Sequence, residues 1–456
     1  MAVLIDQELC TGCKMCSDVC PVDAISGDAG KPQSIDENKC VLCGQCVQMC
    51  SSFASVFDEE IEPIEKKLSD RKMLKGIKEP LFAAYYDNNI HKVVDILNDK
   101  NQFSVVQCAP AVRVAIAEDF GMDLGSLTPG KMAAALRKLG FDRVYDTNFS
   151  ADLTIMEEGT ELIERVTKNE KLPMFTSCCP AWVKYMEQSH PEYLDHLSTC
   201  KSPQQMAGAI FKTYGAKLDN KSAKDIASVS IMPCTCKSFE SERTEMNSSG
   251  ERDVDVVLTT RELAYLIKEM DIDFVNLQEE NFDQPLGNYT GAGNIFGVTG
   301  GVMEAAIRTG YELITNQPID SVDVLAVRGN KNFSESIIKV GDLELKVAVV
   351  AGLKNVEPII EAMKNGKADY HFVEVMTCPE GCISGGGQPK VLLPKDKPMA
   401  YENRISGTYQ HDSESKLRKS HENPAIKKLY KDFLKNPLGH KSHELLHTKY
   451  YSRKDK

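Results

Sequence analysis

The sequence predicts a large α/β domain preceded by a small, cysteine-rich α+β domain. From Phe103 onward, apolar runs (SVVQCAPAVRVAIAEDF, SVSIMPC, DVLAVRG, LKVAVVAG) alternate with helix-like segments (GKMAAALRKLG, TTRELAYLIKEM, TGGVMEAAIRTGYELI). Strands that alternate with helices are typical of layered folds with parallel strands. Half of the 16 cysteines fall in the first 50 residues, which predicts a small domain stabilised by metal.

Composition and charge exclude several classes of protein. With 456 residues, of which 42% are hydrophobic and 26% charged, the chain is long enough for two or three globular domains. A net charge of −12 makes nucleic acid an unsuitable partner for the whole molecule. No apolar run approaches the roughly 20 residues of a membrane span. The start, MAVLIDQELC, lacks the features of a secretory signal. We therefore expect a cytoplasmic protein without membrane or nucleic-acid partners.

Residues 1–57 contain two copies of one cysteine pattern, C-x2-C-x2-C-x3-C. This is the bacterial ferredoxin pattern, in which the fourth cysteine of each run binds the other cluster. Zinc ribbons are the alternative, but they rarely use this rhythm. We expect two 4Fe-4S clusters and hence electron transfer in a ferredoxin-like domain. The predicted ligand sets are Cys10, Cys13, Cys16 and Cys50 for one cluster, and Cys40, Cys43, Cys46 and Cys20 for the other.

Residues 58–102 are charged, and we expect two short amphipathic helices linking the domains. The α/β domain should then span residues 103–390, followed by a C-terminal segment, 391–456. Gly125–Lys131 resembles a phosphate-binding loop, but Met132 replaces the Ser or Thr that would hold magnesium, so a helix starting at Pro129 is the better interpretation. A dinucleotide-binding interpretation of Gly291, Gly293 and Gly297 is rejected because no clear strand precedes them.

Three further cysteine stretches point to one more metal centre. In EVMTCPEGCISGGGQP, Cys378 and Cys382 are four residues apart, a spacing that places both on one face of a helical turn. The glycines that follow let the backbone approach a large, soft group such as an iron–sulfur cluster. A buried pair of structural cysteines beside a flexible loop is the alternative. FTSCCPAW and IMPCTCKSFE supply Cys179 and Cys234, which brings the number of thiolates to the four of a 4Fe-4S cluster.

At these three stretches the sequence resembles the iron-only (FeFe) hydrogenases, and the resemblance runs from about Val105 to the C-terminus. It implies an H-cluster, in which a 4Fe-4S cluster is joined by one cysteine thiolate to a diiron centre that carries CO, cyanide and an azadithiolate. It further implies that four cysteines are the ligands, with Cys382 as the bridge. These are Cys179, Cys234, Cys378 and Cys382.

The resemblance also implies roles for the residues around this group. Lys237 would hydrogen-bond a cyanide, and Cys178 would exchange protons with the azadithiolate as general acid and base. A proton relay would continue through Glu158, Ser198 and Glu161, with Arg165 beside Glu161 at the exit. A solvated helix face is the alternative for these acids. The remaining pocket residues would be Ala109 and Pro110, which cradle the other cyanide, Met232 and Met376 as apolar wall, and Phe296.

Four residues depart from the commonest family pattern: Cys108, Cys200, Cys236 and Glu380. Our hypothesis is that Cys236 and Glu380 change the potential of the cluster or its response to oxygen, and the alternative is that they are buried thiols and a solvent-facing acid. Residues 391–456 resemble the C-terminal belt of the family. This belt is basic from Lys416 onward, which suits either docking of an acidic carrier or a solvated tail.

The function that the resemblance implies is a cytoplasmic oxidoreductase of anaerobic hydrogen metabolism that interconverts H₂ with protons and electrons. A ferredoxin or similar electron carrier would be its redox partner, and maturation proteins would deliver the diiron unit. The alternatives are a subunit of a larger redox complex, a non-catalytic iron–sulfur assembly factor and a hydrogen sensor.

Overall fold

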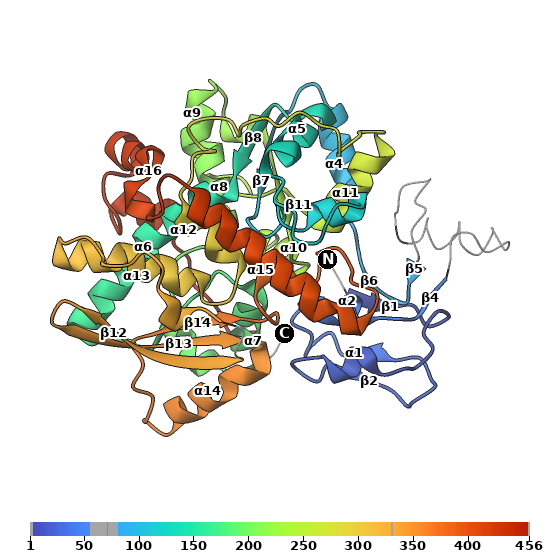
Figure 1. Cartoon of the computed structure of the whole chain (residues 1–456), viewed down its shortest axis with the longest axis horizontal. Coiled ribbons are helices and arrows are strands. Elements are labelled where there is room, and N and C mark those ends of the chain that lie inside the picture. Colours follow the sequence, from blue (N-terminus) through green and yellow to red (C-terminus); the bar gives the residue numbers. More distant parts are fainter. Residues whose placement is uncertain (1–2, 55–70, 72–80, 330–331, 455–456) are drawn as a thin grey trace.

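Two four-stranded sheets, each covered by helices on both faces, form the body of the molecule (Figure 1). The structure, a computed structural model, describes residues 3–54, 71, 81–329 and 332–454. The first sheet has the order β11-β10-β7-β8 and is parallel throughout. The second has the order β12-β13-β14-β9. Their bounds are β7 Phe103–Cys108, β8 Arg143–Asp146, β9 Met174–Phe175, β10 Ile226–Met232, β11 Val256–Thr259, β12 Phe333–Val340, β13 Leu343–Ala351 and β14 Phe372–Met376.

Helices follow the predicted alternation. The α/β class is confirmed, and α5 begins at Pro129 as expected. The helix α11 begins with a capping box in which Thr259 and Glu262 each bind the other's backbone N–H. The helices of this part are α4 Ile90–Asn98, α5 Pro129–Leu139, α6 Thr147–Lys168, α7 Pro180–Ser189, α8 Pro203–Ile210, α9 Ala216–Leu218, α10 Cys236–Ser241, α11 Thr260–Glu269, α12 Gly291–Asn294, α13 Gly301–Thr315 and α14 Glu357–Lys364.

The core explains why β7 and β10 are apolar along their whole length. On one face of the first sheet, side chains of α4, α5 and α11 pack on β7 and β10 in one apolar cluster. On the other face, α6 and α8 pack against Val105 and Ile226. Strands covered on both sides read as continuous hydrophobic runs, which is what makes them recognisable in the sequence. The second sheet lies in the same way between α13 and the pair α7 and α14.

Two parts of this sheet differ from the prediction. DVLAVRG is not a strand: Leu325–Val327 form a short 3-10 turn, and the side chain of Leu325 is 70% exposed. A short apolar run alone cannot distinguish a strand from such a turn. The strands β12 and β13 form an antiparallel hairpin around Gly341, whose φ of 60° suits a tight turn, so the sheet is mixed.

The N-terminal residues form a small separate lobe, drawn blue in Figure 1. It contains β1 Val3–Ile5, α1 Met15–Asp18, β2 Ile25–Ser26, β3 Ser34–Ile35, α2 Gln45–Met49 and β4 Phe53–Ala54. Of the predicted linker 58–102, the structure describes residues 71 and 81–102, and these contain one helix, α4; the rest of the expected helical segment lies outside the described residues. The linker also contains two strands that were not expected: β5 (Leu81–Phe82) pairs with β4, and β6 (Ala84–Tyr86) pairs with β1.

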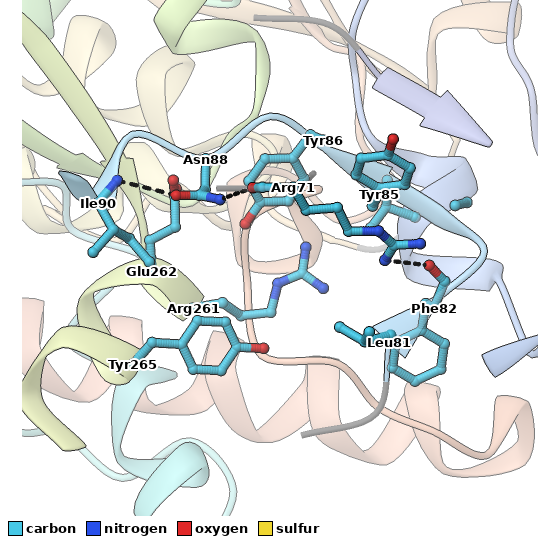
Figure 2. A pocket seen from close by; sticks show the side chains of 12 residues that line it. Arg71, Leu81, Phe82, Tyr85, Tyr86, Asn88, Ile90, Arg261, Glu262 and Tyr265 are labelled. Carbon is cyan, nitrogen blue, oxygen red and sulfur yellow. Dashed lines mark hydrogen bonds between the residues drawn. The ribbon is translucent and has the colours of Figure 1, made fainter. Parts of the chain in front are cut away.

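A pocket lies where this lobe meets α11, and Figure 2 shows the side chains around it. Arg71 donates to the Phe82 carbonyl (2.9 Å), and Asn88 donates to the Arg71 carbonyl (2.6 Å). Tyr86 hydrogen-bonds Thr259 across the junction (2.6 Å), and Arg261 lies 5.3 Å from its ring centroid. These contacts join the lobe to the first sheet.

The C-terminal segment wraps over the body as α15 (Lys397–Glu414), α16 (Pro424–Leu429) and α17 (His440–Leu446); α15 is the long red helix across the front of Figure 1. Arg404 of α15 is buried and donates to the Ile383 and Pro389 carbonyls. At the start of α15, Lys397 donates to the Gln48 carbonyl of the N-terminal lobe (3.0 Å). Among the described residues, none of the helices has both the length and the apolar character needed to cross a membrane.

Candidate active site

One cavity is lined by residues that follow four parallel strands. It lies at the carboxyl ends of β7 and β10 in the first sheet and of β9 and β14 in the second. Such strand ends are where α/β folds place their ligands. Met232 and Met376 are the last residues of β10 and β14, and both line the cavity. All the pocket residues expected from the sequence line it: Ala109, Pro110, Cys178, Cys179, Met232, Cys234, Lys237, Phe296, Met376, Cys378 and Cys382.

Four thiols converge on this cavity from three distant segments. Cys179 stands directly before α7, where Pro180 begins the helix, and Cys234 follows β10 after Pro233. Cys378 comes two residues after β14. Burial first, and then the neighbouring thiols Cys179 and Cys234, raise the pKa of Cys382 to about 12. These four sulfur donors therefore lie close together in a largely apolar space, which fits an iron–sulfur cluster.

The backbone between Cys378 and Cys382 is not the helical turn that their spacing suggested. Glu380 and Gly381 both have positive φ, 61° and 94°, and a 3-10 helix begins only at Cys382. A Cβ on Gly381 would lie 2.8 Å from the Thr299 nitrogen, so glycine is required there. A turn through the left-handed region, rather than a helix, therefore brings both thiols to the cavity.

The following glycines serve a second purpose that the sequence did not indicate. A Cβ on Gly386 would lie 2.6 Å from the Cys43 carbonyl oxygen, in the N-terminal lobe. Gln48 donates to the Gln388 carbonyl across the same contact (2.8 Å). The glycine run thus lets the lobe dock directly against the stretch that carries Cys378 and Cys382.

The eight N-terminal cysteines lie in two groups. Burial, followed by the charges of Cys10 and Cys50, raises the pKa of Cys16 to about 11. Burial, followed by the charges of Cys40 and Cys20, raises the pKa of Cys43 to about 12. The neighbours of these two thiols are those expected from the crossed ferredoxin pattern, in which the fourth cysteine belongs with the other run.

The second of these groups reaches the cavity. The charge of Cys234 contributes to the raised pKa of Cys43, and the charge of Cys43 raises the pKa of Cys378 after burial and Cys234. Thr235 donates to the Leu42 carbonyl (2.7 Å) beside them. The group around Cys43 is thus the one placed next to the cavity.

The acids expected in a proton relay are buried in α6 and are not a solvated helix face. Ser198 donates to Glu161 (2.8 Å), and Arg165 donates to the other oxygen of the same carboxylate (2.6 Å). Burial and the charge of Glu161 raise the pKa of Glu158 to about 8, against the lowering effect of the Ser198 hydroxyl. Oε2 of Glu158 is buried and has no hydrogen-bond partner in the described part of the chain.

Cys178 connects this row of side chains to the cavity. It lines the cavity, and its pKa lies well above the ordinary value because of burial and then the charge of Glu158. The thiol therefore holds its proton at neutral pH. The structure thus brings Cys178, Glu158, Ser198, Glu161 and Arg165 together in the predicted order.

Lys237 lines the cavity but is held by a partner that the sequence did not reveal. Its ammonium donates to the Cys178 carbonyl (2.9 Å) and to Glu240 (2.9 Å), and Glu240 also accepts from Ser202 and Gln204. Burial lowers the pKa of Lys237, but Glu240 more than offsets this and keeps the side chain charged. The sequence signal for this ion pair is the three-residue spacing of Lys237 and Glu240, which places both side chains on one face of α10.

A second missed carboxylate supports the wall of the cavity. Glu374 of β14 is buried and accepts from the backbone N–H of Gly300 and Met303, both at 2.7 Å, at the start of α13. Burial raises its pKa to about 7. It lies inside the cysteine stretch, but nothing in the sequence marks it, because only the packing shows what it binds.

The departures from the family pattern occupy different environments. Cys108, Cys200 and Cys236 are fully buried, and Glu380 is half-buried. Cys236 lies near Cys234, whose charge after burial raises its pKa. The basic C-terminal residues are in part paired within the chain: Arg418 pairs with Asp412 and Lys419 with Glu312.

Comparison with known proteins gives three family matches. Residues 102–386 match the iron only hydrogenase large subunit, C-terminal domain, and residues 398–453 match the iron hydrogenase small subunit. Residues 2–65 match the 4Fe-4S dicluster domain.

Relatives and solved structures agree with these matches. The NADP-reducing hydrogenase subunit HndD of Solidesulfovibrio fructosivorans is 45% identical over 438 residues, covering 92% of this chain and 74% of the relative. The periplasmic Fe hydrogenase large subunit of Nitratidesulfovibrio vulgaris is 47% identical over 391 residues, covering 85% of this chain and 86% of the relative. The structure of the FeFe-hydrogenase HydA(deltaEFG) superimposes with a TM-score of 0.71 at 42% identity, covering 80% of this chain and 98% of that chain.

More distant relatives have another role. The cytosolic Fe-S cluster assembly factor narfl of Xenopus tropicalis is 29% identical over 426 residues, covering 91% of this chain and 83% of the relative. The domain matches, the identities above 40% and the thiol-lined cavity together decide the family. The chain belongs to the iron-only hydrogenases, and its cofactors are the H-cluster and 4Fe-4S clusters.

Proposed function

We propose that this chain is an enzyme that catalyses 2 H⁺ + 2 e⁻ ⇌ H₂ and exchanges the electrons with a ferredoxin or similar carrier. The observation that carries the proposal is the cavity in which four thiols meet Cys178 and Lys237 at the inner end of a buried row of acids. When bound there, the H-cluster supplies the two-electron chemistry. The chain itself supplies the ligands, the proton path and the exclusion of water.

Four thiolates would hold the group, with Cys382 as the bridge to the diiron unit; the other three are Cys179, Cys234 and Cys378. Lys237 would present its charged N–H donors to an anionic ligand, since Glu240 and the Cys178 carbonyl fix its ammonium. Ala109 and Pro110 would cradle the group from the end of β7, while Met232, Met376 and Phe296 form an apolar wall.

Cys178 would deliver and collect protons at the cavity as a general acid and base. Its thiol is protonated at neutral pH, and Glu158 behind it, with a pKa of about 8, can take up and release a proton under physiological conditions. Ser198 would pass protons between Glu158 and Glu161, because its hydroxyl both donates and accepts. Arg165 would hold Glu161 at the outer end of the path.

Electrons would enter through the N-terminal lobe. Cys10, Cys13, Cys16 and Cys50 would hold the outer 4Fe-4S cluster, and the group around Cys43 would hold the cluster next to the cavity. We propose that the ferredoxin domain spans residues 1–57, the linker 58–102, the catalytic domain 103–390 and the belt 391–456. Maturation proteins that deliver the diiron unit belong to the same proposal.

A larger redox complex is a second candidate for the physiological setting. It is favoured by the 45% identity to a protein named as a subunit of an NADP-reducing hydrogenase. The cytoplasmic location predicted from the N-terminus stays a prediction, because a relative of similar identity is named as periplasmic.

The test is anaerobic reconstitution of the full chain with iron, sulfide and a synthetic diiron cofactor, followed by assay of hydrogen evolution from reduced viologen. Cys178→Ala should abolish activity while the infrared bands of CO and cyanide remain. Cys108→Ala is the matched control, since that thiol is buried nearby but does not line the cavity. Absence of both activity and infrared bands would refute the proposal and favour an assembly-factor role.

A further inference from the structure

A second constellation of metal-binding side chains lies at the outer end of the acid row. Glu161 of α6, Cys200 before α8 and His447 after α17 are all buried, and one ligand atom from each lies within 4.8 Å of the other two. We call these three residues the exit site. We propose that the exit site binds a divalent cation of the zinc type and that the bound ion blocks the proton path.

The donor set favours zinc among common cations. A thiolate, an imidazole and a carboxylate are the three side-chain ligands that Zn²⁺ binds, whereas magnesium and calcium require oxygen alone. Tetrahedral Zn²⁺ with bonds of about 2.0–2.3 Å holds its ligand atoms roughly 3.3–3.8 Å apart. Cys200 Sγ lies 3.8 Å from Glu161 Oε2, so this pair is already at the separation that zinc needs.

The surroundings of His447 match those of a zinc-binding histidine. Its Nε2 lies 3.2 Å from Glu157, and its Nδ1 lies 2.8 Å from the Thr199 hydroxyl. The Thr199 backbone N–H in turn donates to Glu161, so the hydroxyl that contacts Nδ1 belongs to a residue bound to the exit site. A metal at Nδ1 would displace this hydroxyl from the ring nitrogen. With Nδ1 on the metal, Nε2–H would donate to Glu157, the carboxylate–histidine–metal arrangement that orients such ligands.

Two hydrogen bonds from the C-terminal segment hold the Glu157 carboxylate in place. The Tyr430 hydroxyl donates to one oxygen (2.6 Å), and the Leu438 backbone N–H donates to the other (2.8 Å). Both donors come from the C-terminal segment, as does His447. Cys200 and His447 also form a backbone β-bridge, so the two ligands from distant parts of the chain are fixed relative to each other.

The local charge suits a dication. Glu157 and Glu161 are two carboxylates against a single guanidinium, Arg165. Binding replaces the Cys200 thiol proton, which leaves to solvent: Zn²⁺ plus the thiol becomes a zinc thiolate plus H⁺. Two carboxylates and one thiolate against one arginine leave two negative charges, which the ion neutralises.

The consequence for catalysis rests on the proposed function. Glu161 accepts the hydrogen bond of Ser198 and would pass protons to and from it. A carboxylate that is bound to zinc has a lone pair engaged by the metal, and the charge of the ion disfavours its protonation. Zinc bound outside the cavity would therefore slow hydrogen evolution without contacting the iron ligands.

The experiment uses the reconstituted full chain under anaerobic conditions, with Zn²⁺ as the probe. Zinc binding is measured by equilibrium dialysis and by X-ray absorption at the zinc edge, where iron does not interfere, and iron content is followed to exclude replacement in the clusters. Hydrogen evolution is measured in parallel, each variant against its own zinc-free rate, and a chelator is then added.

Cys200→Ala and His447→Gln are the test variants. The matched controls are Cys108→Ala, a buried thiol remote from Glu161, and His421→Gln, whose histidine lies among carboxylates elsewhere on the chain. The expected result is one bound zinc with a single sulfur neighbour and an inhibition that the chelator reverses. Zinc affinity and sensitivity to inhibition should both fall by about tenfold or more in each test variant, but in neither control.

Equal zinc binding in wild type and both test variants would overturn the site. Zinc bound through Cys200 without inhibition would overturn the block of the proton path. If one test variant fails to fold, the other decides. If the reconstituted chain makes no hydrogen at all, the proposed function fails, whereas the dialysis and absorption data still decide the site.

Discussion

Ser198 donates a 2.8 Å hydrogen bond to Glu161, and this contact joins two segments 37 residues apart in the interior of the protein. Both side chains are buried, and the Ser198 hydroxyl also acts on Glu158, one helical turn before Glu161. A single hydroxyl thus stands between two acids.

Ser198→Ala should lower hydrogen evolution by about 10²-fold or more, since proton transfer by a positioned group contributes about that much. The cofactor content should not change, and infrared bands of CO and cyanide report it. Ser150→Ala is the control, because Ser150 is a buried serine of α6 that donates only to the Thr147 carbonyl. Normal activity in Ser198→Ala would show that protons do not pass this hydroxyl.

Glu158→Gln should make the stability of the protein less dependent on pH. The folded carboxyl releases its proton near pH 8, against an ordinary value of 4.5, so its contribution to the free energy of unfolding is fully present below about pH 4.5 and is lost as the pH rises through 8. The variant does not lose this contribution. The difference in free energy of unfolding between wild type and variant should therefore change by a few kcal/mol between pH 4.5 and pH 8.

Urea denaturation at several pH values between 4.5 and 9 measures this difference. If the free energy of unfolding depends on pH in the same way in wild type and Glu158→Gln, Glu158 is ionised in the folded protein. In that case it would not exchange protons near neutrality.

Glu240→Gln should release the ammonium of Lys237, because the variant keeps the shape of the side chain but loses the charge that holds it at 2.9 Å. We expect shifted cyanide bands in the infrared spectrum and a lower melting temperature, since breaking a buried ion pair costs about 3–5 kcal/mol. Asp253→Asn is the control. It breaks the buried ion pair with Lys201 (2.7 Å), so it should lower the melting temperature without shifting the cyanide bands. Unshifted cyanide bands in Glu240→Gln would argue against a contact between Lys237 and cyanide.

Gly386→Ala should weaken the docking of the N-terminal lobe, because the added Cβ would lie 2.6 Å from the Cys43 carbonyl oxygen. We expect a several-fold slower electron transfer from a reduced ferredoxin, measured by stopped-flow, with all iron retained. Gly310→Ala, where the added Cβ meets nothing within 4 Å, should behave like wild type. Unchanged transfer in Gly386→Ala would place the route for electrons elsewhere.

The sequence predicted what depends on local spacing. The crossed cysteine pattern and the start of α5 at Pro129 could be predicted because each lies within a few residues. Most of the cavity residues followed instead from the resemblance of three short motifs to a known family. The strand predicted at DVLAVRG was wrong, and the strands at 81–86 were not expected within the linker. The reason is that a short apolar or charged segment adopts its structure only together with its neighbours.

The sequence by itself therefore determined the family, the α/β class, the metal chemistry and the identity of the cavity residues. Only the tertiary structure decided that Glu240 holds Lys237, that the glycines seat the N-terminal lobe and that His447 stands beside Glu161 and Cys200. The physical reason is that these contacts join segments separated by up to several hundred residues. Burial and packing bring them together, and no spacing along the chain records which distant side chains will meet.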